Sequence, residues 1–355
     1  MFVDLLQRLT RRIDLTEDEM SGLMEQLMSG ALTDAQIGAF MAALATKGET
    51  FTELAGAART MRRKAYRLHV PASTVVDTCG TGGDGAQTFN ISTTAAFVVA
   101  GCGVTVAKHG NRSVSSRCGS ADVLEALGVR LDVDPEVVEE IIGDIGIGFL
   151  FAPLYHGAMK YAAKARKEVG IRSIFNMLGP LTNPAGANCQ VLGVFAPELT
   201  EMFAKALQLL GTRRAFVVHG HDGLDEISAC APTRVTELQD GLVRTYDLDP
   251  ERLLGRTADP DALRGGSSEE NARILQSVLQ GSSGPCRDVV VLNAAAALIA
   301  AGKAEDFREG IRMAEQSIDS GAAFDKLKSL VRLTREKAPS ESLEPPPKTA
   351  FTSGN

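Results

Sequence analysis

A cluster of glycines constrains the fold of this chain more than any other stretch. Four glycines stand within six positions of Asp77–Thr94, which reads DTCGTGGDGAQTFNISTT. The apolar pair Val75–Val76 precedes them, and an apolar run at 95–100 typical of a helix follows. Glycine lets the backbone approach an anion closely, and the first N–H groups of a helix have no partner within the helix. The order strand, glycine loop and helix start therefore predicts a phosphate site.

From about residue 71, short β-rich runs alternate with alanine-rich stretches. We expect strands at 104–106, 149–151, 191–195, 215–218 and 289–292, and helices at 121–127, 199–210 and 294–301. The alternation predicts an α/β fold with a mostly parallel sheet covered by helices, and ligands beyond the carboxyl ends of its strands. Residues 234–238 and 242–246 flank Asp240–Gly241 and predict an antiparallel hairpin at one edge.

Residues 1–70 are expected to form a small all-helical domain, and residues 71–337 the α/β domain. The last segment, 338–355, is rich in serine and proline and is predicted to be disordered. The helices of the first domain are marked by capping boxes, in which a threonine precedes Glu or Gln by three positions. These boxes are Thr16 with Glu19, Thr33 with Gln36, and Thr50 with Glu53.

Composition limits the class of protein. A net charge of -7 argues against a general nucleic-acid or membrane-surface protein. The six cysteines include no C-x-x-C pair, which indicates free thiols in a reducing compartment. No apolar run approaches the ~18 residues that a membrane-spanning helix needs. We therefore expect a cytoplasmic protein without a membrane partner.

The glycine loop also matches G-x-G-x-x-G, the dinucleotide-binding pattern. That fold requires an acid at the end of the next strand, where this chain has Lys108–His109, which suits phosphate better. The stretch Lys108–Asp122, KHGNRSVSSRCGSAD, adds two arginines and four serines. Such a loop can neutralise a di- or triphosphate, although a solvated basic loop is the alternative.

An acidic cluster follows the strand expected at 215–218. Asp225 and Glu226 offer hard oxygen ligands that suit Mg²⁺ held between carboxylates and phosphates. An exposed acidic turn is the alternative, and His219-x-His221 would suit zinc only with a third ligand, which is not evident. Asp84 lies in the glycine loop, and a carboxylate beside phosphate requires an intervening cation or hydroxyl donor.

Several long motifs together resemble those of the anthranilate phosphoribosyltransferase family. They are DTCGTGGDG, FNIST, KHGNRSVSS, CGSAD, RSIFNMLGPLTNP and DGLDEIS. The resemblance implies transfer of the phosphoribosyl group of 5-phosphoribosyl 1-pyrophosphate to anthranilate in tryptophan biosynthesis, giving N-(5-phosphoribosyl)anthranilate and pyrophosphate. It also implies Mg²⁺ (we expect two ions per subunit), a homodimer, and a helical domain joined by a segment near residues 170–190.

The resemblance also assigns roles to individual residues. The donor pocket would consist of Gly80, Gly83, Asp84, Thr88, Asn90, Ile91, Ser92, Thr93, Lys108, His109, Gly110, Asn111, Arg112, Ser113, Val114, Ser115, Ser116 and Ser120. Gly80, Asn111 and Arg166 would contact anthranilate. Ser92, Asp225 and Glu226 would bind Mg²⁺. No catalytic nucleophile is expected, because Lys108 and Mg²⁺ would stabilise the charge that develops on the leaving group.

Two other functions remain open at this point. A pyrimidine nucleoside phosphorylase shares the architecture and a lysine-rich loop, but it would bind inorganic phosphate and a nucleoside. It would need neither the Asp225–Glu226 metal site nor the FNIST pattern. A non-catalytic relative that binds nucleic acid would require a basic stripe, which the net charge of -7 disfavours.

Overall fold

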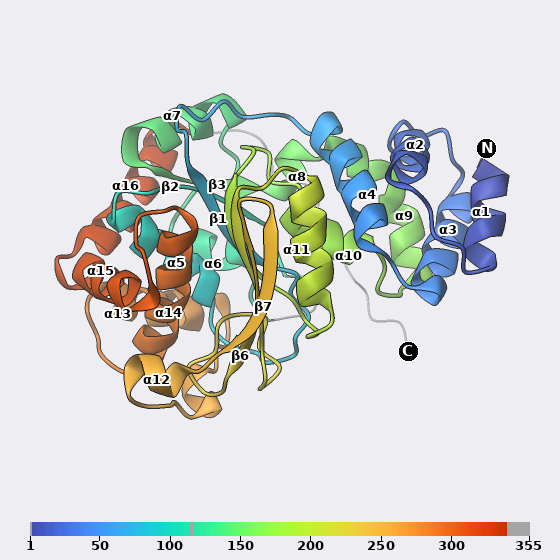
Figure 1. The fold of residues 1–355 in the computed structure, drawn as a ribbon. Coiled ribbons are helices and arrows are strands. Elements are labelled where there is room, and N and C mark those ends of the chain that lie inside the picture. Colours follow the sequence, from blue (N-terminus) through green and yellow to red (C-terminus); the bar gives the residue numbers. More distant parts are fainter. Residues whose placement is uncertain (1, 114–116, 339–355) are drawn as a thin grey trace, which may run out of the picture.

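The computed structural model describes residues 2–113 and 117–338. A helical unit lies on one side and a larger α/β unit on the other (Figure 1). The predicted site residues Val114, Ser115 and Ser116 lie outside the described residues, as does most of the tail predicted to be disordered.

The helical unit begins with four helices. They are α1 (Phe2–Thr10), α2 (Glu17–Met28), α3 (Asp34–Lys47) and α4 (Phe51–Lys64). All three predicted capping boxes are confirmed, at the starts of α2, α3 and α4. The inward faces of these helices bury leucine, methionine and phenylalanine side chains in a continuous apolar core.

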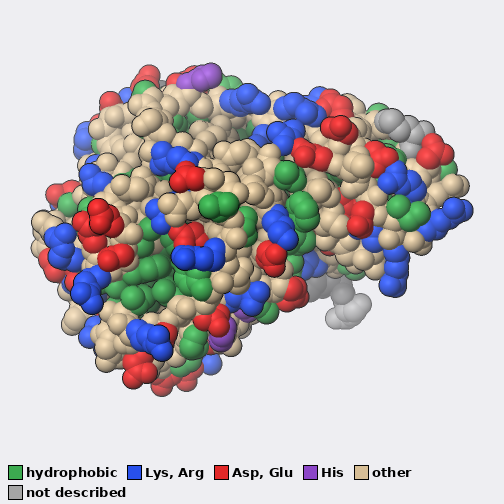
Figure 2. All heavy atoms as spheres, viewed as in Figure 1, with side chains coloured by type: hydrophobic (Ala, Val, Ile, Leu, Met, Phe, Trp, Pro, Cys, Tyr) green, Lys and Arg blue, Asp and Glu red, His purple; other side chains and the backbone are tan. Residues whose placement is uncertain are grey.

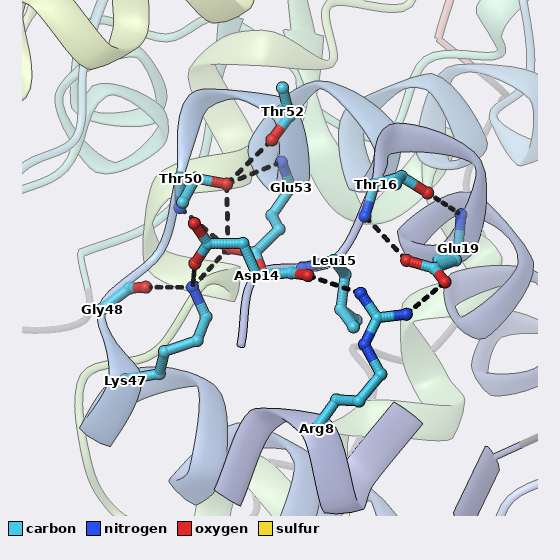
Figure 3. Close-up of polar contacts among 10 residues, drawn as sticks. All are labelled: Arg8, Asp14, Leu15, Thr16, Glu19, Lys47, Gly48, Thr50, Thr52 and Glu53. Atoms are coloured by element: carbon cyan, nitrogen blue, oxygen red, sulfur yellow. Dashed lines mark hydrogen bonds and ion pairs between the residues drawn. The ribbon is translucent and has the colours of Figure 1, made fainter. Parts of the chain in front are cut away.

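A buried carboxylate joins the ends of these helices (Figure 3). Glu53 is 0% exposed, and its oxygens accept hydrogen bonds from Leu15 N and Thr50 N, both at 2.9 Å. Lys47 Nζ lies 3.0 Å from Glu53 and 2.7 Å from Asp14. Burial lowers the pKa of Lys47, but these two acids outweigh it, so that the pKa of Lys47 is raised. The α1–α2 and α3–α4 connections are thus joined through one ion-paired cluster.

The α/β unit contains a seven-stranded sheet of order β3-β2-β1-β4-β5-β6-β7. Its strands are β1 (Val75–Gly80), β2 (Thr105–Gly110), β3 (Ile147–Phe151), β4 (Cys189–Gly193), β5 (Arg214–Gly220), β6 (Thr233–Gln239) and β7 (Leu242–Leu248). The first five strands in this order pair in parallel and the last two pair antiparallel. The predicted α/β class and mostly parallel sheet are therefore confirmed.

Two features of the sheet bear on function. The strand order changes direction at β1, which lies between β2 and β4, and ligands of open α/β sheets bind beyond such a switch point. The predicted hairpin is present, with Asp240 at φ 48° and Gly241 at φ 80°, as the tight turn requires.

Helices cover both faces of the sheet. They are α5 (Ile91–Gly101), α6 (Ser120–Ala126), α7 (Pro135–Ile145), α11 (Leu199–Leu209), α12 (Pro250–Leu254), η3 (Pro260–Leu263), α13 (Ser268–Leu279), α14 (Pro285–Ala300), α15 (Phe307–Asp319) and α16 (Ala322–Glu336). The strand predicted at 289–292 is wrong, because these residues lie within α14. All four are at most 2% exposed, and a helix buried on every side shows no periodicity to distinguish it from a buried strand.

The connection from β3 to β4 passes through the helical unit. It consists of α8 (Ala152–Tyr155), η1 (Gly157–Met159), α9 (Lys160–Val169), α10 (Phe175–Leu178) and η2 (Gly179–Leu181). α9 packs against α2 and α3, and α10 packs against α4 (Figure 1). On the α/β side, Arg59 Nη2 donates to Leu209 O at 2.8 Å and Arg62 Nε to Leu181 O at 2.7 Å.

The surface carries charges of both signs. Acidic and basic side chains are interspersed on the face shown in Figure 2. That face therefore offers no continuous basic stripe to a nucleic-acid backbone. Within residues 2–113 and 117–338, no helix is both long and apolar enough to cross a membrane.

Candidate active site

The glycine loop, residues 80–85, leaves the carboxyl end of β1. Gly82, Gly83 and Gly85 have φ of 65°, 78° and 77°, a region that L side chains rarely adopt. A Cβ on Gly80 would lie 2.7 Å from Asp225 Oδ2. A Cβ on Gly193, at the end of the neighbouring β4, would overlap the backbone carbonyl of Asp225. Glycine at these positions lets the loop after β5 pass directly over the ends of β1 and β4.

The first turn of α5 faces this loop. Asn90 is the N-cap, and its side chain does not cap the helix. The N–H of Ser92 donates to Glu226 Oε1 at 3.0 Å, and Lys108 Nζ lies 3.5 Å from Ser92 Oγ. Lys108 also donates to Thr78 O and is 4% exposed, and burial lowers its pKa. The helix start, the lysine and the acid therefore lie in one network.

Three carboxylates lie around this network. Asp225 N donates to Asp84 Oδ2 at 3.3 Å, and Gly82 N donates to Asp225 Oδ2 at 2.9 Å. Burial raises the pKa of both Asp225 and Glu226, and repulsion from Asp84 raises them further. A divalent cation would relieve this repulsion.

The carboxylates do not form a closed metal cage. Among the described residues, no group of three or more His, Cys, Asp or Glu side chains is arranged to hold a metal ion. The nearby donors are oxygens, which suit Mg²⁺, and Mg²⁺ usually keeps waters and shares one or two carboxylates with substrate phosphates. The residues therefore fit a Mg²⁺ site that the substrate completes.

The basic loop after β2 is largely tied to α6. Arg112 pairs with Asp122 at 3.1 Å and Glu125 at 2.8 Å. Ser113 N donates to Asp122 Oδ2 at 3.0 Å, and Ser120 Oγ donates to Asn111 O at 3.3 Å. The charge of Arg112 is thus already balanced by two acids, whereas Lys108 bonds Thr78 O on β1 and Ser92 Oγ on α5.

Arg166 lies on α9, apart from these networks. Its guanidinium lies 5.3 Å from the centroid of the Phe175 ring. It is half-buried, burial lowers its pKa, and in residues 2–113 and 117–338 it has no hydrogen-bond or ion-pair partner. A half-buried cation without an anionic partner is suited to an anionic ligand.

Both parts of the chain match known families. Residues 72–324 match the glycosyl transferase family, a/b domain, and residues 3–65 match the glycosyl transferase family, helical bundle domain. Anthranilate phosphoribosyltransferase of Syntrophobacter fumaroxidans is 74% identical, covering 95% of this chain and 100% of that protein. The Geobacter sulfurreducens enzyme is 55% identical, covering 95% and 100%.

Solved structures of anthranilate phosphoribosyltransferases have the same fold as this chain. The Thermus thermophilus anthranilate phosphoribosyltransferase superposes with a TM-score of 0.88 at 44% identity, covering 93% of this chain and 99% of that one. The Saccharomyces cerevisiae enzyme, in complex with PRPP and Mg, gives 0.85 at 30% identity, covering 94% and 98%. The chain belongs to the anthranilate phosphoribosyltransferase family.

The remaining predicted positions of this anthranilate phosphoribosyltransferase family member are placed as follows. Ile91 and Thr93 are buried in the first turn of α5, Gly110 ends β2, and Asn111 is exposed just beyond it. Thr88 forms an isolated bridge with Arg264. The zinc alternative finds no support in the geometry, because His219 Nδ1 bonds Val194 O at 2.7 Å and His221 pairs with Asp247 at 3.3 Å.

A histidine pair beside Lys108 was only partly foreseen. His109 Nδ1 lies 3.2 Å from Gly179 O, and His109 Nε2 lies 3.2 Å from His156 Nε2. The carbonyl requires a proton on Nδ1, so Nε2 of His109 accepts from His156. Burial lowers the pKa of His109 to about 3 and that of His156 to about 4, so both rings are neutral near pH 7.

Sequence reasoning missed the buried groups that support the site. Asp77 is 0% exposed and accepts from His109 N at 3.1 Å and from Asn183 Nδ2 at 2.8 Å. Asn271, on α13, donates to Asn90 Oδ1 at 3.0 Å. An acid within the apolar start of β1 was a signal for Asp77, since a buried carboxylate needs partners. Asn271 gave no comparable signal.

Proposed function

We propose that this chain carries out the reaction of its family at the carboxyl ends of β1, β2 and β5. The reaction transfers the phosphoribosyl group of 5-phosphoribosyl 1-pyrophosphate to the amine of anthranilate, in tryptophan biosynthesis. One observation carries the location: Ser92, in the first turn of α5, bonds both Lys108 and Glu226, and the adjacent Asp225 bonds Gly82 of the glycine loop. This is a phosphate site with its own cation and with oxygen ligands for a metal.

The donor is held by backbone and lysine. The glycine loop and the first turn of α5 offer N–H groups to the pyrophosphate, and Lys108 adds a buried positive charge. Of the described residues that follow β2, we assign Asn111, Arg112, Ser113 and Ser120 to the same pocket. Since these groups are fixed before the reaction, they stabilise the charge that develops on the departing pyrophosphate.

We assign Mg²⁺ to Ser92, Asp225 and Glu226, with two ions per subunit. Bound there, Mg²⁺ would neutralise charge on the pyrophosphate. Asp225 and Glu226 hold the loop after β5 against Gly82 and Ser92. The raised pKa values of the two acids support this assignment, because burial and neighbouring acids disfavour their charged forms, which a bound cation would stabilise.

The acceptor is positioned rather than activated. The amine of anthranilate is neutral near pH 7, so that it needs no strong base. Arg166 would bind the anthranilate carboxylate, with Asn111 and the Gly80 backbone beside it, and this orients the amine toward the ribose carbon. The ribose carbon acquires positive character as pyrophosphate leaves, as in glycosyl transfer.

We further propose a cytoplasmic homodimer whose helical domain, residues 1–70, is joined by the segment near 170–190. The packing of α9 and α10 on α2, α3 and α4 supports the domain arrangement. The six free cysteines support a reducing compartment.

The loss of anthranilate fluorescence tests this function. We expect the purified protein to remove the signal when both Mg²⁺ and phosphoribosyl pyrophosphate are present, and not when either is omitted. A parallel incubation with thymidine and phosphate tests the phosphorylase alternative. Release of thymine without consumption of anthranilate would overturn the proposal.

A further inference from the structure

Arg172 connects the acceptor helix with the glycine loop. It lies just beyond α9, whose C-cap Gly170 has φ 66°, in a motif to which no role has yet been given. Its Nη2 donates to Gly83 O at 3.1 Å, and its guanidinium carbon lies 3.9 Å from the centroid of the Phe195 ring. A Cβ on Gly83 would collide with this guanidinium. Glycine at 83 is favoured by its φ of 78°, and its lack of a side chain leaves room for the guanidinium.

Phe195 is itself fixed to the start of the loop. Its N–H donates to Thr81 Oγ1 at 3.2 Å, and Thr81 N donates to Gly193 O at 2.9 Å. On the other side of the loop, Gly82 N donates to Asp225 Oδ2 at 2.9 Å. The loop is thus held by the guanidinium of Arg172 at the carbonyl of Gly83 and by a carboxyl oxygen of Asp225 at the N–H of Gly82.

Holding one carbonyl determines where the next N–H points. The peptide unit is planar and trans, so that the N–H of Asp84 points away from the carbonyl of Gly83. Arg172 therefore sets the direction of an amide in the loop that meets the donor. In the part of the chain that the structure describes, the Arg172 guanidinium has no ion-pair partner. It is held by its hydrogen bond to Gly83 O and by its stacking on the Phe195 ring.

We infer that Arg172 is a positioning residue that holds the glycine loop in its donor-binding form from the acceptor side. It follows Arg166 on the same connection, and α9 packs on α2 and α3. A shift of the helical unit is therefore transmitted to the loop through one guanidinium. The inference rests on the proposed function, since it names the loop as the donor site.

The test compares Arg172→Ala, Arg172→Lys and Phe195→Leu with the unaltered enzyme. We expect Arg172→Ala to raise the KM for phosphoribosyl pyrophosphate, and its Kd by calorimetry with Mg²⁺, by roughly 10- to 100-fold, the range caused by small misplacements of binding groups. Lysine keeps the charge of Arg172 without its flat stacking surface, and leucine removes the ring on which Arg172 stacks. We therefore expect Arg172→Lys and Phe195→Leu to give donor KM and Kd values between those of the unaltered enzyme and those of Arg172→Ala. Because Arg172 is exposed, we expect the Tm of Arg172→Ala to equal that of the unaltered enzyme.

Arg252→Ala is the matched control, because Arg252 is an exposed arginine whose partner, Asp249, lies on the same turn at 3.4 Å. We expect it to leave all constants unchanged. A donor Kd and KM within twofold of the unaltered values in Arg172→Ala would overturn the inference, as would a rise in the anthranilate KM alone, which would mean direct contact with the acceptor. Absence of transfer by the unaltered enzyme would instead overturn the proposed function.

Discussion

The helical unit and the α/β unit each bury a cluster of charges, and the two clusters are built in opposite ways. Around Glu53, hydrogen bonds and ion pairs join a carboxylate to a cation or to an N–H donor, with Lys47 between two acids. Around Asp225, acids face acids, and Lys108 is the cation among them. The charges of the first cluster are balanced within the chain, whereas we propose that a bound cation and substrate complete the second.

This difference separates stability from function. A buried ion pair whose partners are both present is destabilised strongly when one is removed. A cluster of acids is destabilising until a cation binds, as expected at sites tuned for function. Changes in the first cluster should therefore lower stability, and changes in the second should lower turnover.

The largest expected effect is that of Asp225→Asn with Glu226→Gln. Loss of both carboxylates should lower kcat by about 10³-fold, the scale of losing a key electrostatic stabiliser, and weaken the dependence on Mg²⁺. Since burial and repulsion disfavour the charged acids, the Tm should not fall. Anthranilate fluorescence and thermal unfolding would measure the two effects. Retained activity would refute the metal assignment.

Next comes Glu53→Ala in the helical unit. We expect a loss of about 3–5 kcal/mol of unfolding free energy, the usual cost of leaving one buried charge unpaired, with the KM values of the folded enzyme unchanged. Urea unfolding would measure it. Glu19→Ala is the matched control, because Glu19 occupies the same position of a capping box at 32% exposure (Figure 3). For Glu19→Ala we expect a loss of about 1 kcal/mol of unfolding free energy. Equal losses in the two variants would show that the burial of Glu53 does not contribute to stability.

Arg166→Ala should have a smaller, selective effect. Because the Arg166 guanidinium has no hydrogen-bond or ion-pair partner among the described residues, its loss leaves no polar protein group unpaired. We expect the KM for anthranilate to rise roughly 10- to 100-fold, as for loss of a charged hydrogen bond, with the KM for the donor unchanged. Steady-state kinetics with each substrate varied would separate the two. An equal rise in both would argue against a carboxylate clamp.

The smallest effect concerns acid sensitivity. His109 and His156 are neutral in the folded state, with pKa values of about 3 and about 4, but they take up protons when unfolded, below an ordinary pKa of about 6.5. The unfolded state therefore binds more protons, and stability falls as pH decreases from about 6.5 to about 4.

His156→Gln should reduce this loss by about 2 kcal/mol at pH 5, as measured by urea unfolding at pH 5 and pH 7. His69→Gln, at an exposed histidine, serves as the control and should leave the loss unchanged. If His156→Gln behaves like the control, the buried pair does not cause the acid sensitivity.

Local rules predicted the parts of the fold whose signals are local. Capping boxes located the starts of α2, α3 and α4, and Asp240–Gly241 located the hairpin. They failed at 289–292, where α14 is buried on all sides and the pattern of apolar residues carries no period.

The candidate site was predictable where backbone and charge chemistry leave sequence motifs. Gly80, Lys108 and Asp225 are examples, because glycine spacing and charge type point to phosphate and metal. Groups that act through others were not predictable in this way. Asn271 bonds Asn90 from a helix far along the chain, and Arg172 bonds Gly83 although the two are distant in the sequence. Only the folded structure brings either pair into contact.

Gly193 has a consequence for comparing genomes. A side chain there would overlap the carbonyl of Asp225, so any chain of this fold with a larger residue at that position must move the loop after β5. Such a chain keeps its glycine-rich loop but displaces the two carboxylates of Asp225 and Glu226 that we propose bind Mg²⁺. The residue at position 193 therefore indicates, from sequence alone, which otherwise similar chains have a displaced loop after β5.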